Sequence, residues 1–105
     1  TWRREVSKVA KKETETPIEG ACHVGLIFRF KRPKSHYRSN GLLKQSAPAY
    51  LIVKKNDLDK LVRSTLDALS GIAFIDDCQV TNLSATKRYC NEDEVVGADI
   101  LINEL

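Results

Sequence analysis

The stretch Asn56–Val80, NDLDKLVRSTLDALSGIAFIDDCQV, decides the fold of this chain and carries most of its chemistry. Its first half predicts the clearest helix, over residues 57–70, because one face repeats at three- and four-residue steps. The positions on that face are Leu58, Leu61, Val62, Thr65, Leu66 and Leu69. Ser70-Gly71 is a typical helix end, so the chain should turn there.

Three aspartates of this stretch, Asp57, Asp59 and Asp77, are candidates for a metal site. Residues two apart on a helix point about 200° away from each other, so Asp57 and Asp59 converge only at a helix start, with Asp57 as N-cap. The seven residues after Ser70 can span roughly 23 Å, enough to return Asp77 along a helix of roughly 20 Å. Three carboxylates at one point require a cation, and oxygen ligands favour Mg²⁺ or Mn²⁺.

The same aspartates also fit a purely structural role. Asp57 would then cap the helix, and Asp59, Arg63 and Asp67 would form a surface ladder of ion pairs at four-residue steps. Asp76-Asp77 would be an ordinary turn. Spacing alone favours this interpretation, which predicts that the three carboxylates lie far apart.

Outward from this stretch, periodicity and turn residues predict the remaining elements. They are a helix over residues 2–13, a strand over 21–30 with alternate residues facing the core, a short strand over 50–55, and strands over 77–89 and 94–103. Asn91-Glu92-Asp93 is expected to be the hairpin between the last two strands. The order indicates one α+β domain over residues 1–105, with two helices packed on a small mixed sheet.

Residues 31–49 are expected to form a long loop, because they hold two prolines and the turn-forming pair Asn40-Gly41. A loop this long is either a solvated insertion or a functional arm. Basic and aromatic side chains are interleaved in it, which favours contact with DNA phosphates. The candidates are Lys31, Arg32, Lys34, His36, Tyr37 and Arg38.

The composition, with 42% hydrophobic and 30% charged residues, suits a soluble globular domain and argues against a disordered tail. Basic residues crowd the first half, while acidic residues gather from Asp57 onward. This pattern suits a metal-dependent nuclease, which attracts phosphate and holds a cation. Three cysteines without CxxC spacing indicate reduced thiols in a cytosolic protein, and no apolar run is long enough to cross a membrane.

The segment from Asp57 to Val80 resembles the RusA family of Holliday junction resolvases, which carries the pattern D-x-D-N-L-x-K…L-D-x-L…D-D-x-Q. The resemblance extends upstream through FRFKRPKSHY and downstream to Lys87. It implies an endonuclease that cuts four-way DNA junctions symmetrically, uses Mg²⁺ and acts as a homodimer. It also implies a mixed sheet with two helices, and a cytoplasmic setting in bacteria or prophages.

Carried over by position, the resemblance makes Asp57, Asp59 and Asp77 the metal-binding catalytic carboxylates, and it places Arg63 where the family has a catalytic lysine. Arginine keeps the positive charge but does not readily donate its proton. Lys60 stands where asparagine is usual. The family usually has a strand ahead of its first helix, whereas this chain begins at that helix, so we expect the strand to be missing and a sheet edge to be exposed.

The expected reaction is hydrolysis of a phosphodiester by a metal-activated water, with Arg63 neutralising charge on the phosphate. Further side chains would position the DNA backbone. These are Lys54, Lys55, Lys60, Lys87 and Arg88. Two alternatives remain: a module of the same fold that binds branched DNA without cutting it, and a structural or assembly protein.

Overall fold

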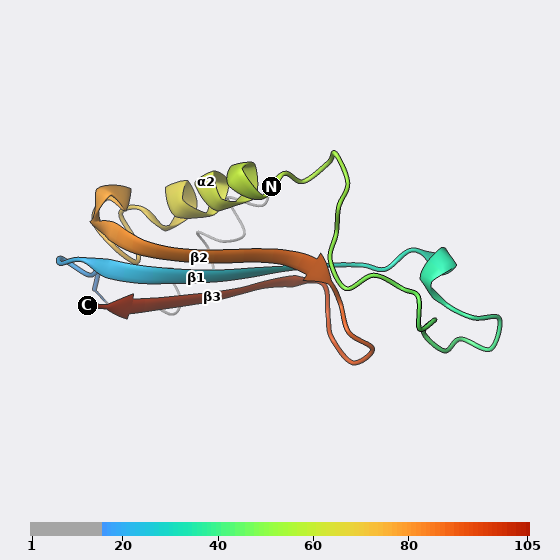
Figure 1. The fold of residues 1–105 in the computed structure, drawn as a ribbon. Coiled ribbons are helices and arrows are strands. Elements are labelled where there is room, and N and C mark those ends of the chain that lie inside the picture. Colours follow the sequence, from blue (N-terminus) through green and yellow to red (C-terminus); the bar gives the residue numbers. More distant parts are fainter. Residues whose placement is uncertain (1–15) are drawn as a thin grey trace.

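The computed structural model describes residues 16–105 of the chain, and Figure 1 shows its arrangement. Its elements are the strands β1 (Cys22–Phe30), β2 (Val80–Tyr89) and β3 (Gly97–Glu104), the helix α2 (Leu58–Leu69), and the single 3-10 turns η1 (Lys34–His36) and η2 (Asp77–Gln79). The helix expected over residues 2–13 lies outside the described residues. The strand predicted over residues 21–30 and the helix predicted over 57–70 are confirmed within one residue at each end.

The three strands form one mixed sheet in the order β2-β1-β3. β2 runs parallel to the central strand β1, and β3 runs antiparallel to it. At the middle of the sheet, Leu26 of β1 lies between Ala85 of β2 and Ile100 of β3. The fold is therefore α+β, as the sequence predicts.

The predicted hairpin between the last two strands is wrong, because β2 and β3 lie on opposite sides of β1. The strand that separates them, β1, carries the four buried side chains Cys22, Val24, Leu26 and Phe28. Because β1 lies in the centre, a neighbouring strand covers each of its edges. A β2–β3 hairpin would leave one edge of β1 exposed to water. Residues 90–96 therefore connect two strands that do not pair with each other.

Three other boundaries differ from the expectation, and one of them is that β3 spans Gly97–Glu104 in place of the predicted 94–103. Residues 50–55 form no strand, and Ile52 in this segment is 90% exposed, so its β-branched composition does not reflect a place in the sheet. β2 begins at Val80 rather than at residue 77, because Asp76 caps the turn η2 ahead of it.

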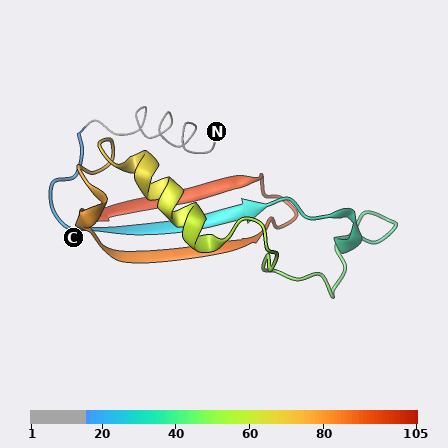
Figure 2. The same cartoon turned by 90° about the horizontal axis from the view of Figure 1, so that it is seen from above.

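The core lies between β1 and α2, which crosses one face of the sheet diagonally (Figure 2). The four buried side chains of β1 pack with four others from the helix and the turn that follows it. These are Ala68, Leu69, Ala73 and Phe74. α2 runs in the opposite direction to β1 and β2, so its start lies near the carboxyl ends of both strands (Figures 1 and 2).

We predict that Leu26→Ala lowers the free energy of unfolding by about 2–5 kcal/mol, because Leu26 is 1% exposed and its loss leaves a cavity. Leu101→Ala on β3 is the matched control, since Leu101 is 57% exposed. It should cost less than about 1 kcal/mol. Urea unfolding followed by circular dichroism measures both, and equal losses would contradict the described core.

Candidate active site

The start of α2 is built as the sequence predicts. Asp57 is the N-cap residue, with an extended backbone, and Asp59 lies in the first turn. Asn56 precedes them with a φ of 61°, a left-handed conformation that asparagine tolerates better than most residues, and this turns the chain into the helix. The Asp57 carboxylate makes no capping hydrogen bond, but it lies 3.6 Å from Lys60 Nζ.

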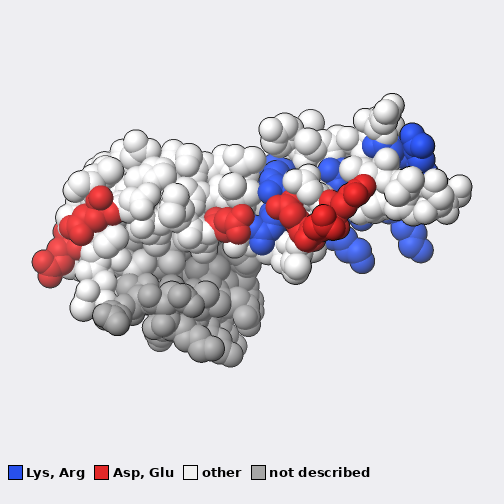
Figure 3. Space-filling view, turned by 90° about the horizontal axis from the view of Figure 1, so that it is seen from below, with Lys and Arg blue, Asp and Glu red and all other residues white. Residues whose placement is uncertain are grey.

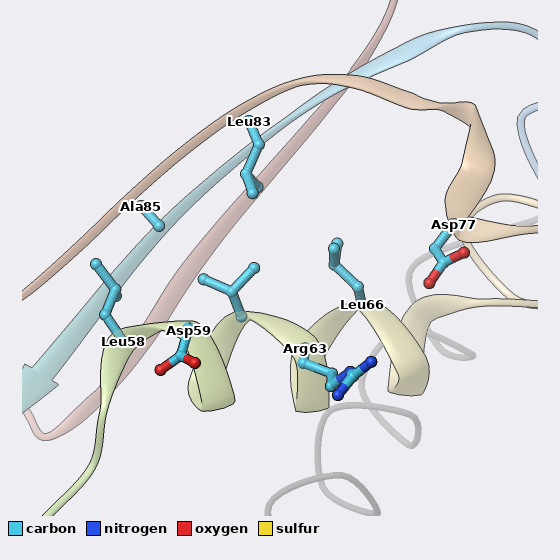
Figure 4. A pocket seen from close by; sticks show the side chains of 8 residues that line it. Leu58, Asp59, Arg63, Leu66, Asp77, Leu83 and Ala85 are labelled. Carbon is cyan, nitrogen blue, oxygen red and sulfur yellow. The ribbon is translucent and has the colours of Figure 1, made fainter.

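A groove of about 680 Å³ lies between α2 and β2, and three of the four predicted catalytic residues line it. In Figure 4, Asp59 lies at the start of the helix, Asp77 lies beyond its other end, and Arg63 lies between them. The remaining lining is apolar. It consists of Leu58, Val62, Leu66, Leu83 and Ala85. Charged side chains are thus presented along an apolar trough that follows the helix.

Asp77 occupies the first position of η2, next to a second carboxylate, Asp76. The pKa of Asp77 is raised, first because its carboxyl shares a hydrogen bond with that of Asp76, then by some loss of solvation and by the negative charges of Asp76 and Asp67. Arg63 acts in the opposite direction. The pKa of Asp76 is lowered, first by the backbone N–H of Cys78. Asp77 therefore sits where added positive charge would be stabilising.

The three aspartates do not meet at one point, contrary to the return path that the sequence allows. Within residues 16–105, no three His, Cys, Asp or Glu side chains are placed to hold a metal ion. Asp57 lines a different pocket from Asp59 and Asp77. The cause is the turn after α2, in which the Ala73 N–H donates to Leu69 O and Phe74 is fully buried. This packing holds η2 at the far end of the helix.

The structural alternative agrees with the structure only in part. This alternative predicts separated carboxylates, which the structure has. It also predicts that Asp57 caps α2, but the Asp57 side chain makes no capping hydrogen bond. In the part of the chain that the structure describes, no ion pair joins Asp59, Arg63 and Asp67. These exposed side chains are therefore not paired with one another.

The predicted lysines gather at the start of α2, around a second pocket of about 520 Å³ that also contains Asp57. Its basic lining residues are Lys54, Lys55 and Lys60. Lys87 lies close by, since its Nζ donates to Asn56 O over 3.2 Å. The positive end of the helix dipole adds to this charge, so the region favours phosphate.

Residues 31–49, called the arm from here on, extend beyond the end of the sheet (Figure 1). Lys31, Lys34 and Arg38 are exposed on it, and Figure 3 shows basic side chains along this end of the molecule. The arm has its own hydrogen bonds, including Arg38 N–H to Leu42 O at 2.7 Å. Its cations are therefore carried on an ordered segment and point into water.

Arg32 is the exception, and its prediction as a phosphate contact is wrong. It is only 7% exposed, its Nε donates to Cys90 O, and its Nη1 donates to Pro48 O, each over 2.7 Å. Its guanidinium also lies 5.4 Å from the centre of the Tyr89 ring. Arg32 thus joins both ends of the arm to the end of β2 and satisfies carbonyls that would otherwise lack a partner.

Arg88 is also used inside the fold. Its guanidinium makes two hydrogen bonds to the Glu94 carboxylate, at 2.5 and 2.7 Å, and another to Tyr89 O. Both side chains are less than a third exposed. Arg88 therefore anchors the connection between β2 and β3, and its charge is neutralised there rather than offered to DNA.

We predict that Arg32→Lys loosens the arm, because lysine keeps the charge but cannot donate from a planar fork to two carbonyls. Stability should fall by about 1–3 kcal/mol, and trypsin should cut within residues 31–49 faster than in the wild type. Arg38→Lys, at an exposed position of the same arm, is the control. Identical digestion of both variants would contradict the anchoring role of Arg32.

A second prediction concerns pH. The Arg88 hydrogen bonds, followed by the backbone N–H of Asn91, lower the pKa of Glu94 from 4.5 to about 2. The stabilisation is therefore present above the unfolded value of 4.5 and is lost as the pH falls towards 2. In urea unfolding between pH 5 and pH 2.5, Glu94→Gln should lose part of the pH dependence of the wild type. Exposed Glu92→Gln should retain it, and parallel curves for wild type and Glu94→Gln would refute the prediction.

Comparison with known proteins identifies the family. The family model described as Endodeoxyribonuclease RusA matches residues 1–98, which is nearly the whole chain. No curated protein and no solved structure matches the chain. Among the described residues, no helix has the length and apolar character needed to cross a membrane. The chain belongs to the RusA endodeoxyribonuclease family, the crossover junction endonucleases that resolve Holliday junctions.

Proposed function

We propose that this chain cuts four-way DNA junctions in the groove between α2 and β2, with Asp77 and Arg63 at the reacting phosphate and Asp59 along the same groove at the start of α2. Family membership supports an endodeoxyribonuclease that acts on branched DNA. The observation that carries the assignment to this groove is the presence of all three side chains along it. If the reaction took place elsewhere on the protein, these charged side chains would have no role in it.

Basic side chains flank the groove at its end near the arm. The lysines around the start of α2 and the exposed cations of the arm would contact the DNA backbone, which fixes its register without reading sequence. They are Lys54, Lys55, Lys60 and Lys87 at the helix, and Lys31, Lys34 and Arg38 on the arm. Arg32 and Arg88 are left out of this set because the fold uses both guanidinium groups.

Arg63 is proposed to stabilise negative charge on the phosphate as the phosphodiester is cleaved. It projects from α2 between the two aspartates of the groove (Figure 4). Arginine does not readily donate its proton, so the contribution proposed for Arg63 is electrostatic.

We propose Mg²⁺ as the cofactor, with Mn²⁺ as a substitute, because the candidate ligands are all carboxylate oxygens. The separation of Asp57, Asp59 and Asp77 does not fit a preformed cage of three carboxylates. It is compatible with the usual Mg²⁺ arrangement, in which one or two carboxylates and the phosphate of the substrate share the ion. Asp77 is favoured as the ligand at the reacting phosphate because it lines the groove, whereas Asp59 lies at the other end of the same groove and Asp57 lies beside Lys60.

The proposed active species is a homodimer of a single domain over residues 1–105, since two symmetric nicks match two sites related by a two-fold axis. Exposed apolar side chains such as those of Ile52 and Val95 support a surface that a second copy of the chain would cover. The three cysteines are free thiols, which suits the reducing cytoplasm of a bacterium whose genome or prophage encodes the protein.

The second candidate function is a module that binds branched DNA without cutting it. Two observations favour it specifically: the carboxylates are not gathered, and Asp57 is paired with Lys60 at the position where the family has asparagine. Junction binding in EDTA, together with an absence of nicks after Mg²⁺ is added, would support this candidate over the nuclease.

The test of the proposed function is cleavage of a synthetic four-way junction in Mg²⁺. We expect wild type to place paired, symmetric nicks and Asp77→Asn to cut at least about 100-fold more slowly, because an electrostatic contribution at the reacting phosphate is lost. Junction affinity should persist, since the change removes a negative charge. Asp93→Asn, an exposed aspartate in the β2–β3 connection, is the matched control. A wild-type cleavage rate for Asp77→Asn would refute the site.

A further inference from the structure

We propose that Gln79 is the positioning residue that fixes Asp77 at the end of the groove. This inference rests on the proposed function, in which Asp77 acts at the phosphate. The Gln79 side chain makes three hydrogen bonds: its Oε1 accepts from the Asp76 N–H over 2.9 Å, and its Nε2 donates to Ile18 O at 2.7 Å and to Gly20 O at 2.9 Å.

The turn that carries Asp77 is short and has little support of its own. It contains only the three residues of η2, and Asp76, Asp77 and Cys78 are all exposed. A reciprocal capping box closes it, in which the Asp76 carboxylate accepts from the Cys78 N–H and Gln79 accepts from the Asp76 N–H. This box shapes the turn but does not attach it to the rest of the protein.

The two bonds from Gln79 Nε2 add a side-chain attachment to the one that the chain makes at Val80, which pairs with Cys22 of β1. Residues 18–20 are themselves held to the core, because the Ile18 N–H donates to Ala73 O at 2.9 Å and Ile18 bridges to fully buried Phe74. The same segment leads directly into the central strand β1 at Cys22. Gln79 therefore connects the turn of Asp77 to the segment that leads into the central strand, across about sixty residues of sequence.

Only a side-chain amide of this length satisfies all three partners. Glutamate at position 79 would keep the acceptor for Asp76 but would present a carboxylate to the carbonyls of Ile18 and Gly20. Alanine would remove every bond. In either case Asp77 would move relative to Arg63 on α2, and a displacement of about 1 Å at a reacting centre can cost roughly 100-fold in rate.

The experiment compares Gln79→Glu and Gln79→Ala with the wild type and Asp77→Asn. Asn103→Asp, which adds the same negative charge at an exposed position of β3, is the matched control. Single-turnover cleavage of the four-way junction, junction affinity in EDTA and the urea midpoint are measured separately. We expect both Gln79 variants to lose about 10- to 100-fold in cleavage rate, with junction affinity within about twofold and a native-like urea transition. Asn103→Asp should cut like the wild type.

Two results would overturn the inference: cleavage at the wild-type rate by both Gln79 variants while Asp77→Asn is inactive, or losses in rate that merely follow losses in stability and affinity. Amide hydrogen exchange separates this outcome from a failure of the proposed function, because it needs no activity. In Gln79→Ala, the amides of residues 76–79 should exchange faster while those of α2 are unchanged. Unchanged exchange at residues 76–79 would overturn the inference even if the wild type does not cut DNA.

Discussion

Burial of the central strand β1 against α2 is the constraint on which the rest of the structure depends. The four buried side chains of β1 need a cover on one face and a neighbour on each edge. Because β2 is parallel to β1, the chain must cross back over the sheet before β2 begins, and α2 makes that crossing. The groove beside α2 is a direct consequence, with Asp59 near the carboxyl ends of the parallel strands and Asp77 just ahead of β2.

This topology also divides the cations into two groups. At the end of the sheet, the strands, the arm and the connection to β3 leave carbonyl groups and a carboxylate that need donors, and Arg32 and Arg88 provide them. The lysines around the start of α2 remain exposed and surround Asp57. The basic surface available to DNA is therefore smaller than the number of basic residues suggests. It is concentrated where the arm lies near the start of α2.

The sequence predicts α2 and β1 well, because their apolar positions repeat with helical and strand periods. It does not reveal that β1 lies between β2 and β3, since nothing local to two successive strands excludes a hairpin. The loop after α2 is long enough to return Asp77 beside Asp59, but the burial of Phe74 keeps Asp77 at the far end of the helix. The role of Gln79 was missed, although the Asp76-x-x-Gln79 spacing of a capping box was a usable signal.

The most direct test of the central claim, that the α2–β2 groove is the reaction site, is Mn²⁺-induced broadening of amide signals in isotope-labelled protein bound to a four-way junction. We expect the signals of Asp59, Arg63 and Asp77 to broaden first, at substoichiometric Mn²⁺, and those of β3 to persist. Broadening that begins at the acidic β2–β3 connection or at Glu104, with the groove signals unaffected, would contradict this claim.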